Sequence, residues 1–128
     1  MTVNKHPIHS HLIRRVPEQF SWIDHRLVRK RYIDQLSHRA SALYLFLVTV
    51  SDSQGLSYYS DCTLGERLNM KTAALIDARN LLVDHQLVAY RKPIYQVLAL
   101  DCRRESIRAD SEAVSIGAIL QQLTGGTK

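Results

Sequence analysis

Apolar residues recur at helical spacing most clearly over Thr63–Val88, whose sequence is TLGERLNMKTAALIDARNLLVDHQLV. Leu64 and Leu68 are four residues apart, so they share one face of a predicted first helix. A second helix is predicted from about Lys71 to His85, because its apolar residues recur at helical spacing: Leu75, Ala78, Leu81 and Leu82. The pattern therefore indicates two short helices joined by a turn.

The ends of these two helices carry the residue types that start and stop helices. Thr63 is expected to cap the first helix through its hydroxyl, and Glu66, three residues later, completes a capping-box pattern. Asn69 is expected in the turn between the helices, since Asn tolerates the left-handed conformation. Gln86 lies where the C-terminal cap of the second helix is expected.

Upstream, the pattern predicts one buried helix and one short strand. Ser37 is a suitable N-cap for a helix over Arg39–Ser51, and the apolar residues of this helix cover most of its circumference. A helix of this kind is a core element. The aromatic segment Leu56–Ser60 reads as a strand.

Downstream, the pattern predicts a β-hairpin. Its strands are Val88–Arg91 and Ile94–Leu100, and Pro93 belongs in the turn because it cannot donate a ladder hydrogen bond. Arg91 and Lys92 lie near the tip, where two cations suit either a phosphate contact or plain solubility.

The N-terminal region is polar and basic. Residues 1–19 are expected to form a flexible basic arm, in which His6, His9 and His11 could ligate a metal or belong to a solvated tail; the lack of a nearby carboxylate or Cys favours the tail. Phe20 and Trp22 are expected to anchor this extension on the domain, and base stacking by Trp22 is the alternative.

The segment Asp24–Ile33 has helix-compatible apolar spacing with a run of basic residues between. A solvated helix face and a phosphate-binding patch explain this run equally well; its members are Arg26, Arg29, Lys30 and Arg31. At the other end, residues 102–128 are expected to form a linker and an amphipathic helix over 109–123. That helix could pack on its own domain, pair with a second copy to form a homodimer, or dock on another protein.

Thr63–Val88 resembles the winged helix-turn-helix domains of bacterial regulators and of phage and plasmid replication proteins. The residues on the apolar positions of the family pattern are Leu64, Leu68, Met70, Leu75, Ala78, Leu82, Leu87 and Val88. Gly65 stands where Ala is usual, and Asn69 and Gln86 stand where Gly is usual. Ala42–Ser60 looks like the first helix and strand of the replication-protein type. The resemblance implies an α+β, mainly α fold over 20–101, in which a three-helix core carries a small antiparallel β-hairpin wing between an N-terminal extension and a C-terminal helix.

Composition agrees with one such domain. The chain has 128 residues, of which 45% are hydrophobic and 23% charged. Its net charge is +5, and residues 1–40 hold eight Lys or Arg against three Asp or Glu, whereas residues 61–101 hold five of each. The apolar run Ala42–Val50 is too short to span a membrane, no signal peptide opens the chain, and Cys62 and Cys102 are isolated, so a reduced cytoplasmic protein is expected.

The resemblance also implies how the chain would contact DNA. The second helix would enter the major groove with its N-terminal residues foremost, and the wing would hold phosphate. The implied contacts are Thr63, Lys71, Thr72, Ala73, Ile76, Asn80, Arg91 and Lys92, with Arg26, Arg29, Lys30 and Arg31 as phosphate contacts of the arm. Three departures weaken this prediction: Ile76 stands where Arg or Lys is frequent, Asp77 would repel phosphate, and Arg79 stands where a core Leu is frequent, so that the helix is rotated or Leu81 takes that place.

The sequence thus predicts a protein that binds double-stranded DNA, as a transcriptional regulator or a replication-initiation accessory of a bacterial or mobile-element system. A protein-interaction adaptor on the same scaffold is the alternative. The chain shows no phosphate-binding loop, no metal-type spacing and no nucleophile elbow, so we expect no enzyme activity, no cofactor and no metal.

Overall fold

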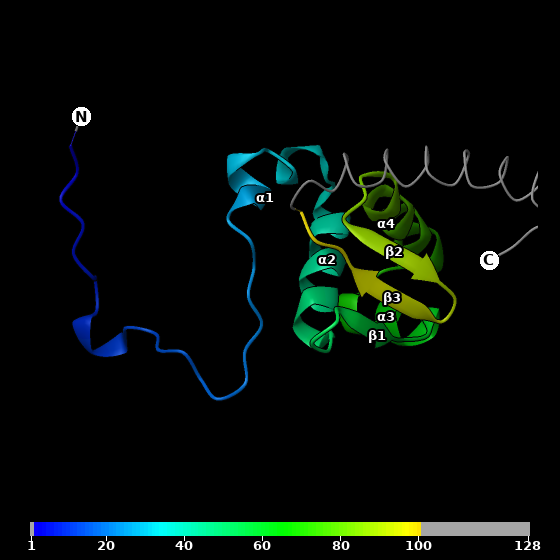
Figure 1. The fold of residues 1–128 in the computed structure, drawn as a ribbon, viewed down its shortest axis with the longest axis horizontal. Coiled ribbons are helices and arrows are strands. Elements are labelled where there is room, and N and C mark those ends of the chain that lie inside the picture. The colour runs from blue at the N-terminus through cyan, green and yellow to red at the C-terminus, as the bar shows by residue number, and fades with distance from the viewer. Residues whose placement is uncertain (1, 101–128) are drawn as a thin grey trace, which may run out of the picture.

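Residues 2–100 are described by the computed structural model, and they form an α+β fold that is mainly helical (Figure 1). The elements in this range are the 3-10 turns η1 (Ser10–Leu12) and η2 (Ile33–Gln35), the helices α1 (Arg26–Arg29), α2 (His38–Val50), α3 (Asp61–Leu68) and α4 (Thr72–Asp84), and the strands β1 (Leu56–Tyr58), β2 (Val88–Arg91) and β3 (Ile94–Val97). The linker and helix predicted over 102–128 lie outside the described residues. None of the helices within residues 2–100 has the length and apolar character needed to cross a membrane.

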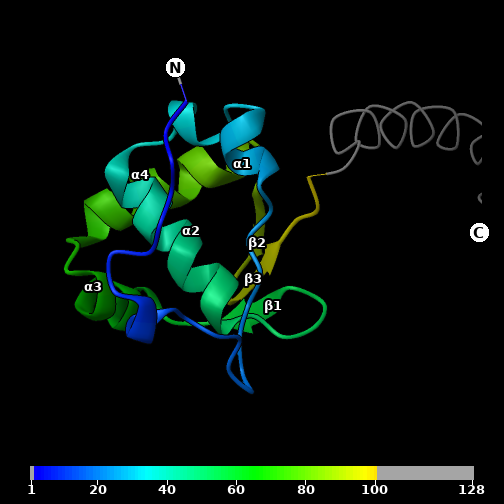
Figure 2. The same ribbon diagram turned by 90° about the vertical axis from the view of Figure 1, so that its left-hand side faces the viewer.

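Helix α2 is the central core element. It begins where its sequence predicts, because the Ser37 hydroxyl accepts a hydrogen bond from the Ala40 amide at 3.1 Å. Leu43 and Leu47 are fully buried on this helix, which packs against α4 and against β3 (Figure 2). The predicted helix and its cap are confirmed to within one residue.

Helix α3 begins three residues before the predicted start. Its N-cap is Ser60, whose hydroxyl accepts from the Thr63 amide at 3.1 Å. The capping role predicted for Thr63 is therefore wrong, and so is the capping box with Glu66, whose carboxylate instead accepts from the Cys62 thiol at 3.8 Å. Ser60 and Asp61 supply the earlier start, since a Ser cap followed by an acidic residue suits the positive end of a helix.

Both α3 and α4 end at a residue in the left-handed conformation. Asn69 has φ 55° and Gln86 has φ 61°, which confirms the helix ends predicted at both positions. After each, an amide closes the last turn by bonding five residues back: Met70 to the Gly65 carbonyl at 2.9 Å, and Leu87 to the Leu82 carbonyl at 3.0 Å. The sharp first turn also explains Gly65, because a Cβ there would lie 2.8 Å from the Met70 carbonyl oxygen.

The three strands form one antiparallel sheet in the order β1-β3-β2. Ser57 of β1 and Tyr90 of β2 both pair with Tyr95 of β3, so the aromatic strand joins the hairpin as predicted. Strand β3 ends at Val97, three residues before the predicted end, and beyond it the Leu98 amide bonds to the Leu87 carbonyl at 3.0 Å.

The hydrophobic core lies between the helices and the sheet, and one charged residue is buried within it. The core residues are Leu27, Ala40, Leu43, Tyr44, Leu47, Val48, Leu64, Leu75, Ala78, Leu82, Leu87, Val88, Tyr95 and Leu100. Arg79 lies on the same face of α4 as Leu75, Ala78 and Leu82 and is only 9% exposed. The helix is therefore not rotated to expose Arg79, and Leu81, which is half-buried, does not replace it.

The Arg79 guanidinium is held by groups from three other elements. Its Nη1 donates to Asp61 Oδ1 of α3 at 2.8 Å and to the Tyr95 hydroxyl of β3 at 2.9 Å. The guanidinium carbon also lies 4.3 Å from the centre of the Tyr90 ring of β2. Burial alone would lower the pKa of Arg79, but the bonds with Asp61 and Tyr95 outweigh it and raise that pKa, so the group stays charged.

In the structure we use the name arm for residues 2–31, which leave the domain on the side of α2 (Figures 1 and 2). Phe20 is 64% exposed and Trp22 is 76% exposed, so the expected burial of this aromatic pair is wrong. The single helix expected over Asp24–Ile33 is also wrong: α1 is one turn long, and Arg31 interrupts the segment with φ 60°.

Gln86→Gly is expected to stabilise the fold by about 0.5–1 kcal/mol, because Gly adopts the left-handed conformation without the steric cost that a side chain carries there. Urea unfolding measures the change. Gln54→Gly is the control, since Gln54 is an exposed loop residue whose φ is not positive, and it should be neutral or destabilising. A loss of stability in Gln86→Gly would contradict the assignment of strain to this position.

Arg79→Ala is expected to lower the free energy of unfolding by about 2–4 kcal/mol, since it leaves the buried Tyr95 hydroxyl and the Asp61 carboxylate without their donor. The Asp61 side chain is 39% exposed and can be partly hydrated, which keeps the loss below that of a fully buried pair. Thermal and urea unfolding followed by circular dichroism measure it, with the exposed Arg29→Ala as the matched control, expected within about 0.5 kcal/mol of wild type. A loss under 1 kcal/mol would show that Arg79 contributes little to the fold.

Candidate nucleic-acid interface

The outward face of α4 collects most of the contacts predicted from the sequence. Lys71, at the N-cap, and Thr72, Ala73, Ile76 and Asn80 are all exposed. The opposite face is buried in the core, so these side chains have no packing role that would require their identity. Arg79 points inward, so it is not part of this face. The exposed residues of the face recur every three or four positions, as expected for one side of a helix.

This face is nearly neutral. Asp77 is exposed on it beside Ile76, which is 37% exposed. Among the exposed residues Lys71, Thr72, Ala73, Ile76, Asp77 and Asn80, only Lys71 is basic, and the negative charge of Asp77 offsets it. The sequence-based concern about Asp77 therefore holds in the structure, since this carboxylate lies on the same surface as the predicted contacts.

Arg39 adds a second cation that sequence reasoning missed. Together with Lys71, Ala73 and Asp77 it lines an open hollow of about 580 Å³ where the start of α2 meets the α3–α4 turn. Arg39 is exposed, in the first turn of α2. Nothing in the sequence links position 39 to position 71, because they meet only through the packing of α2 beside the two helices.

Thr63, Arg91 and Lys92 lie on other elements. Thr63 is half-buried in the first turn of α3, and its hydroxyl oxygen accepts from the Ser60 hydroxyl at 2.9 Å. Arg91 and Lys92 are exposed at the closed end of the β2–β3 hairpin, where Arg91 pairs with Ile94. The two hairpin cations are thus accessible as predicted, whereas Thr63 is already engaged within its helix.

The four basic residues of the arm divide into two pairs. Arg26 binds Asp24, with Nε 3.0 Å from Oδ1, and this hydrogen bonding lowers the pKa of Asp24. Arg31 lies 3.6 Å from Asp34. Arg29 and Lys30 are exposed and form no ion pair within residues 2–100. Of the four basic residues predicted as phosphate contacts of the arm, Arg29 and Lys30 are therefore the two whose charge is not balanced by an ion pair within residues 2–100.

The histidines of the N-terminal arm do not come together as a metal site. The rings of His9 and His11 meet edge to face, with centroids 5.9 Å apart. Among residues 2–100 there is no group of three or more His, Cys, Asp or Glu side chains placed to hold a metal ion.

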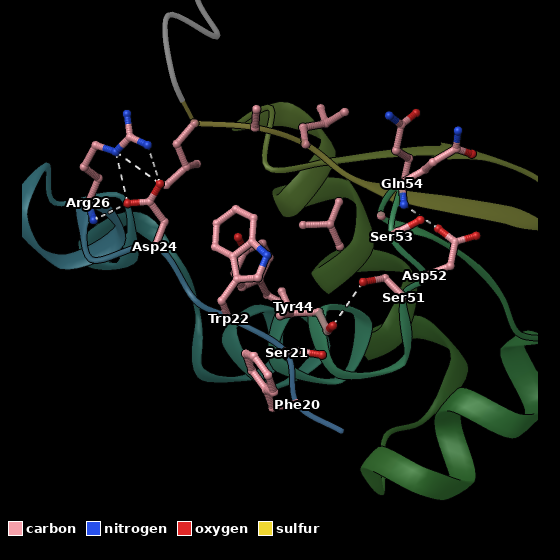
Figure 3. Close-up of a pocket in the computed structure, with 17 residues that line it drawn as sticks. Phe20, Ser21, Trp22, Asp24, Arg26, Tyr44, Ser51, Asp52, Ser53 and Gln54 are labelled. Carbon is pink, nitrogen blue, oxygen red and sulfur yellow. Dashed lines mark hydrogen bonds and ion pairs between the residues drawn. The ribbon is translucent and has the colours of Figure 1, made fainter. Parts of the chain in front are cut away.

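A second cavity, of about 540 Å³, lies beside the arm (Figure 3). Its walls come from the aromatic segment of the arm, the C-terminal half of α2, the loop after α2, and the end of β3 with the residues that follow it. The lining residues are Phe20, Ser21, Trp22, Asp24, Arg26, Tyr44, Val48, Ser51, Asp52, Ser53, Gln54, Gly55, Gln96, Val97, Leu98, Ala99 and Leu100. Sequence reasoning names Phe20 and Trp22 as an anchor, with base stacking as the alternative for Trp22, and Arg26 as a phosphate contact. It does not predict the cavity, because its other walls come from segments far apart in the chain.

Comparison of the chain with protein-family models, with curated proteins and with solved structures gives no match.

Proposed function

We propose that this chain is a DNA-binding protein in which α3 and α4 form a helix-turn-helix and β2–β3 forms the wing of a winged-helix domain. The observation that carries the proposal is the outward face of α4. Lys71, Thr72 and Asn80 are exposed there at the N-terminal and central turns, while every core residue of the helix lies on the other side. Lys and Asn side chains can contact phosphates and base edges in the major groove.

Exposed cations on three further elements are available for additional phosphate contacts. Arg39 of α2 shares a hollow with Lys71, Arg91 and Lys92 are exposed on the hairpin, and Lys30 is exposed in the arm. Contacts from several elements to the phosphate backbone would fix the position of α4 on a duplex without reading sequence. The role we propose is that of a transcriptional regulator or a replication-initiation accessory of a bacterial or mobile-element system.

A protein-interaction adaptor is the second candidate, and it is favoured by the composition of α4. Ile76 and Val83 are each 37% exposed on this helix, and Asp77 on the same surface would repel phosphate. A protein partner would cover the apolar side chains and accept a neutral surface more readily than DNA would.

The test that separates the two candidates is a titration of labelled random-sequence duplex at several salt concentrations, with a sizing run in parallel. Binding that falls steeply with salt supports DNA, because it reports the release of counterions from neutralised phosphates. The absence of binding at low salt, together with a larger complex in the sizing run, would favour the adaptor.

Lys71→Ala is expected to weaken duplex binding and alter sequence preference, at about 1–3 kcal/mol or roughly 5- to 150-fold. Asp77→Asn is the complementary variant and should tighten binding, since it removes a negative charge from the same surface. Misfolding can lower the affinity of Lys71→Ala, but it cannot raise the affinity of Asp77→Asn. The gain in Asp77→Asn therefore tests the interface even if Lys71→Ala is unstable. Unchanged affinity in both variants, measured by fluorescence anisotropy, would remove α4 from the interface.

Arg29→Ala is expected to weaken binding equally for all duplex sequences and to reduce the slope of log K against log salt by about one. Arg26→Ala is the matched control, because Arg26 is already paired with Asp24 and should change the slope less. Equal slopes for wild type and Arg29→Ala would exclude the arm from phosphate contact.

A further inference from the structure

We propose that the cavity beside the arm binds unpaired bases of single-stranded DNA, with Trp22 and Phe20 as the stacking surfaces. The cavity is distinct from the outward face of α4, since no residue of α3 or α4 lines it, although the exposed Arg29 and Lys30 belong to both proposals. The inference therefore adds a second activity and does not depend on duplex binding by α4.

The exposure of the two aromatic rings is the first observation. Trp22 is 76% exposed and Phe20 is 64% exposed, although both line a cavity whose walls include Tyr44, Val48 and Leu98 (Figure 3). Aromatic side chains of this size are normally among the most stabilising when buried. Two accessible ring faces beside a cavity of about 540 Å³, within the roughly 300–1,000 Å³ range of ligand pockets, suit planar groups that stack.

The charge of the segment that carries the aromatic pair favours an anionic partner. Residues 14–31 flank and include the aromatic pair, and they hold six Lys or Arg against two Asp or Glu. Arg14 and Arg15 before the pair, and Arg29 and Lys30 after it, are exposed. Cations on both sides of exposed aromatics are the combination that binds single strands, where the backbone meets the cations and the bases stack on the rings.

One of the two acidic groups that line the cavity is paired with a cation of the protein. Asp24 is held by Arg26, with Nε 3.1 Å from Oδ2. The Asp52 carboxylate accepts the amides of Gln54 and Leu56, each at 2.9 Å. The charge of Asp24 is therefore balanced by Arg26, whereas Asp52 keeps its negative charge, because backbone amides are neutral donors.

The far wall can contact the edges of a stacked base. Ser53, Gln54 and Gln96 are exposed there and carry hydroxyl and amide groups, which both donate and accept hydrogen bonds. Such adaptable groups accept any base, so we expect the site to bind single strands with weak sequence preference.

Trp22 is the only tryptophan of the chain, so its fluorescence reports directly on this site. Titration of the full chain with a 20-nucleotide oligo(dT) should quench the emission in a saturable manner. By anisotropy of the labelled oligonucleotide, Trp22→Ala should bind roughly 5- to 150-fold more weakly, the loss that corresponds to one stacked base. Trp22→Phe should retain most of the affinity, because it keeps an aromatic face.

Tyr58→Ala is the matched control. Tyr58 is 70% exposed on β1 and does not line the cavity, so its removal should leave oligo(dT) binding unchanged. Unchanged Trp22 emission, or equal affinity of wild type and Trp22→Ala, would overturn the proposal. Tighter binding of oligo(U) than of oligo(dT) would overturn its assignment to DNA.

The two proposed interfaces fail in different ways. If the cavity binds single strands and α4 does not bind duplex, oligo(dT) quenches Trp22 while duplex affinity is insensitive to Lys71→Ala and Asp77→Asn. If only α4 binds, duplex affinity responds to those variants and oligo(dT) leaves the emission of Trp22 unchanged.

Discussion

The burial of Arg79 among Asp61, Tyr90 and Tyr95 is the interaction on which the remaining geometry depends. It joins α4 to the start of α3 and to both strands of the hairpin through one guanidinium. An unpaired charge in that position would be costly, so the three partners must be present together for α4 to lie where it does. Burial also raises the pKa of Tyr95, which keeps its hydroxyl protonated beside the cation.

The inward direction of Arg79 decides which residues of α4 face outward. With Arg79 buried beside Leu75 and Leu82, the outward side is left to Thr72, Ile76 and Asn80. A cation that would otherwise strengthen contact with an anionic partner is thus used inside the fold. The outward surface is nearly neutral as a result, and its positive charge comes from Lys71 at the start of α4 and from a neighbour, Arg39.

The arm has the opposite character, because its charge and its aromatic residues are both accessible. Phe20 and Trp22 remain exposed next to a cavity, and Arg29 and Lys30 form no ion pair within residues 2–100. In a structure where the core accounts for the folding of α2, α3, α4 and the sheet, these side chains contribute little to stability. Their composition suits the single-strand site that we propose, whereas the core accounts for the fold.

The sequence by itself determined the elements governed by neighbouring residues. Helix caps, apolar spacing and turn residues act over three to five positions, so Ser37, Asn69 and Gln86 marked helix ends correctly, and the hairpin around Pro93 followed from the strand pattern. Even there a local competitor could prevail, as when Ser60 capped α3 in place of Thr63.

Only the tertiary structure decided the contacts between segments distant in the chain. Arg79 finds partners 18 residues before it and 16 after it, and Arg39 reaches the hollow beside Lys71 from another helix. Ion pairing also depends on where a carboxylate comes to lie. Arg26 is paired with Asp24, whereas Arg29 forms no ion pair within residues 2–100. Such contacts follow from the packing of whole elements, which residue spacing along one segment does not specify.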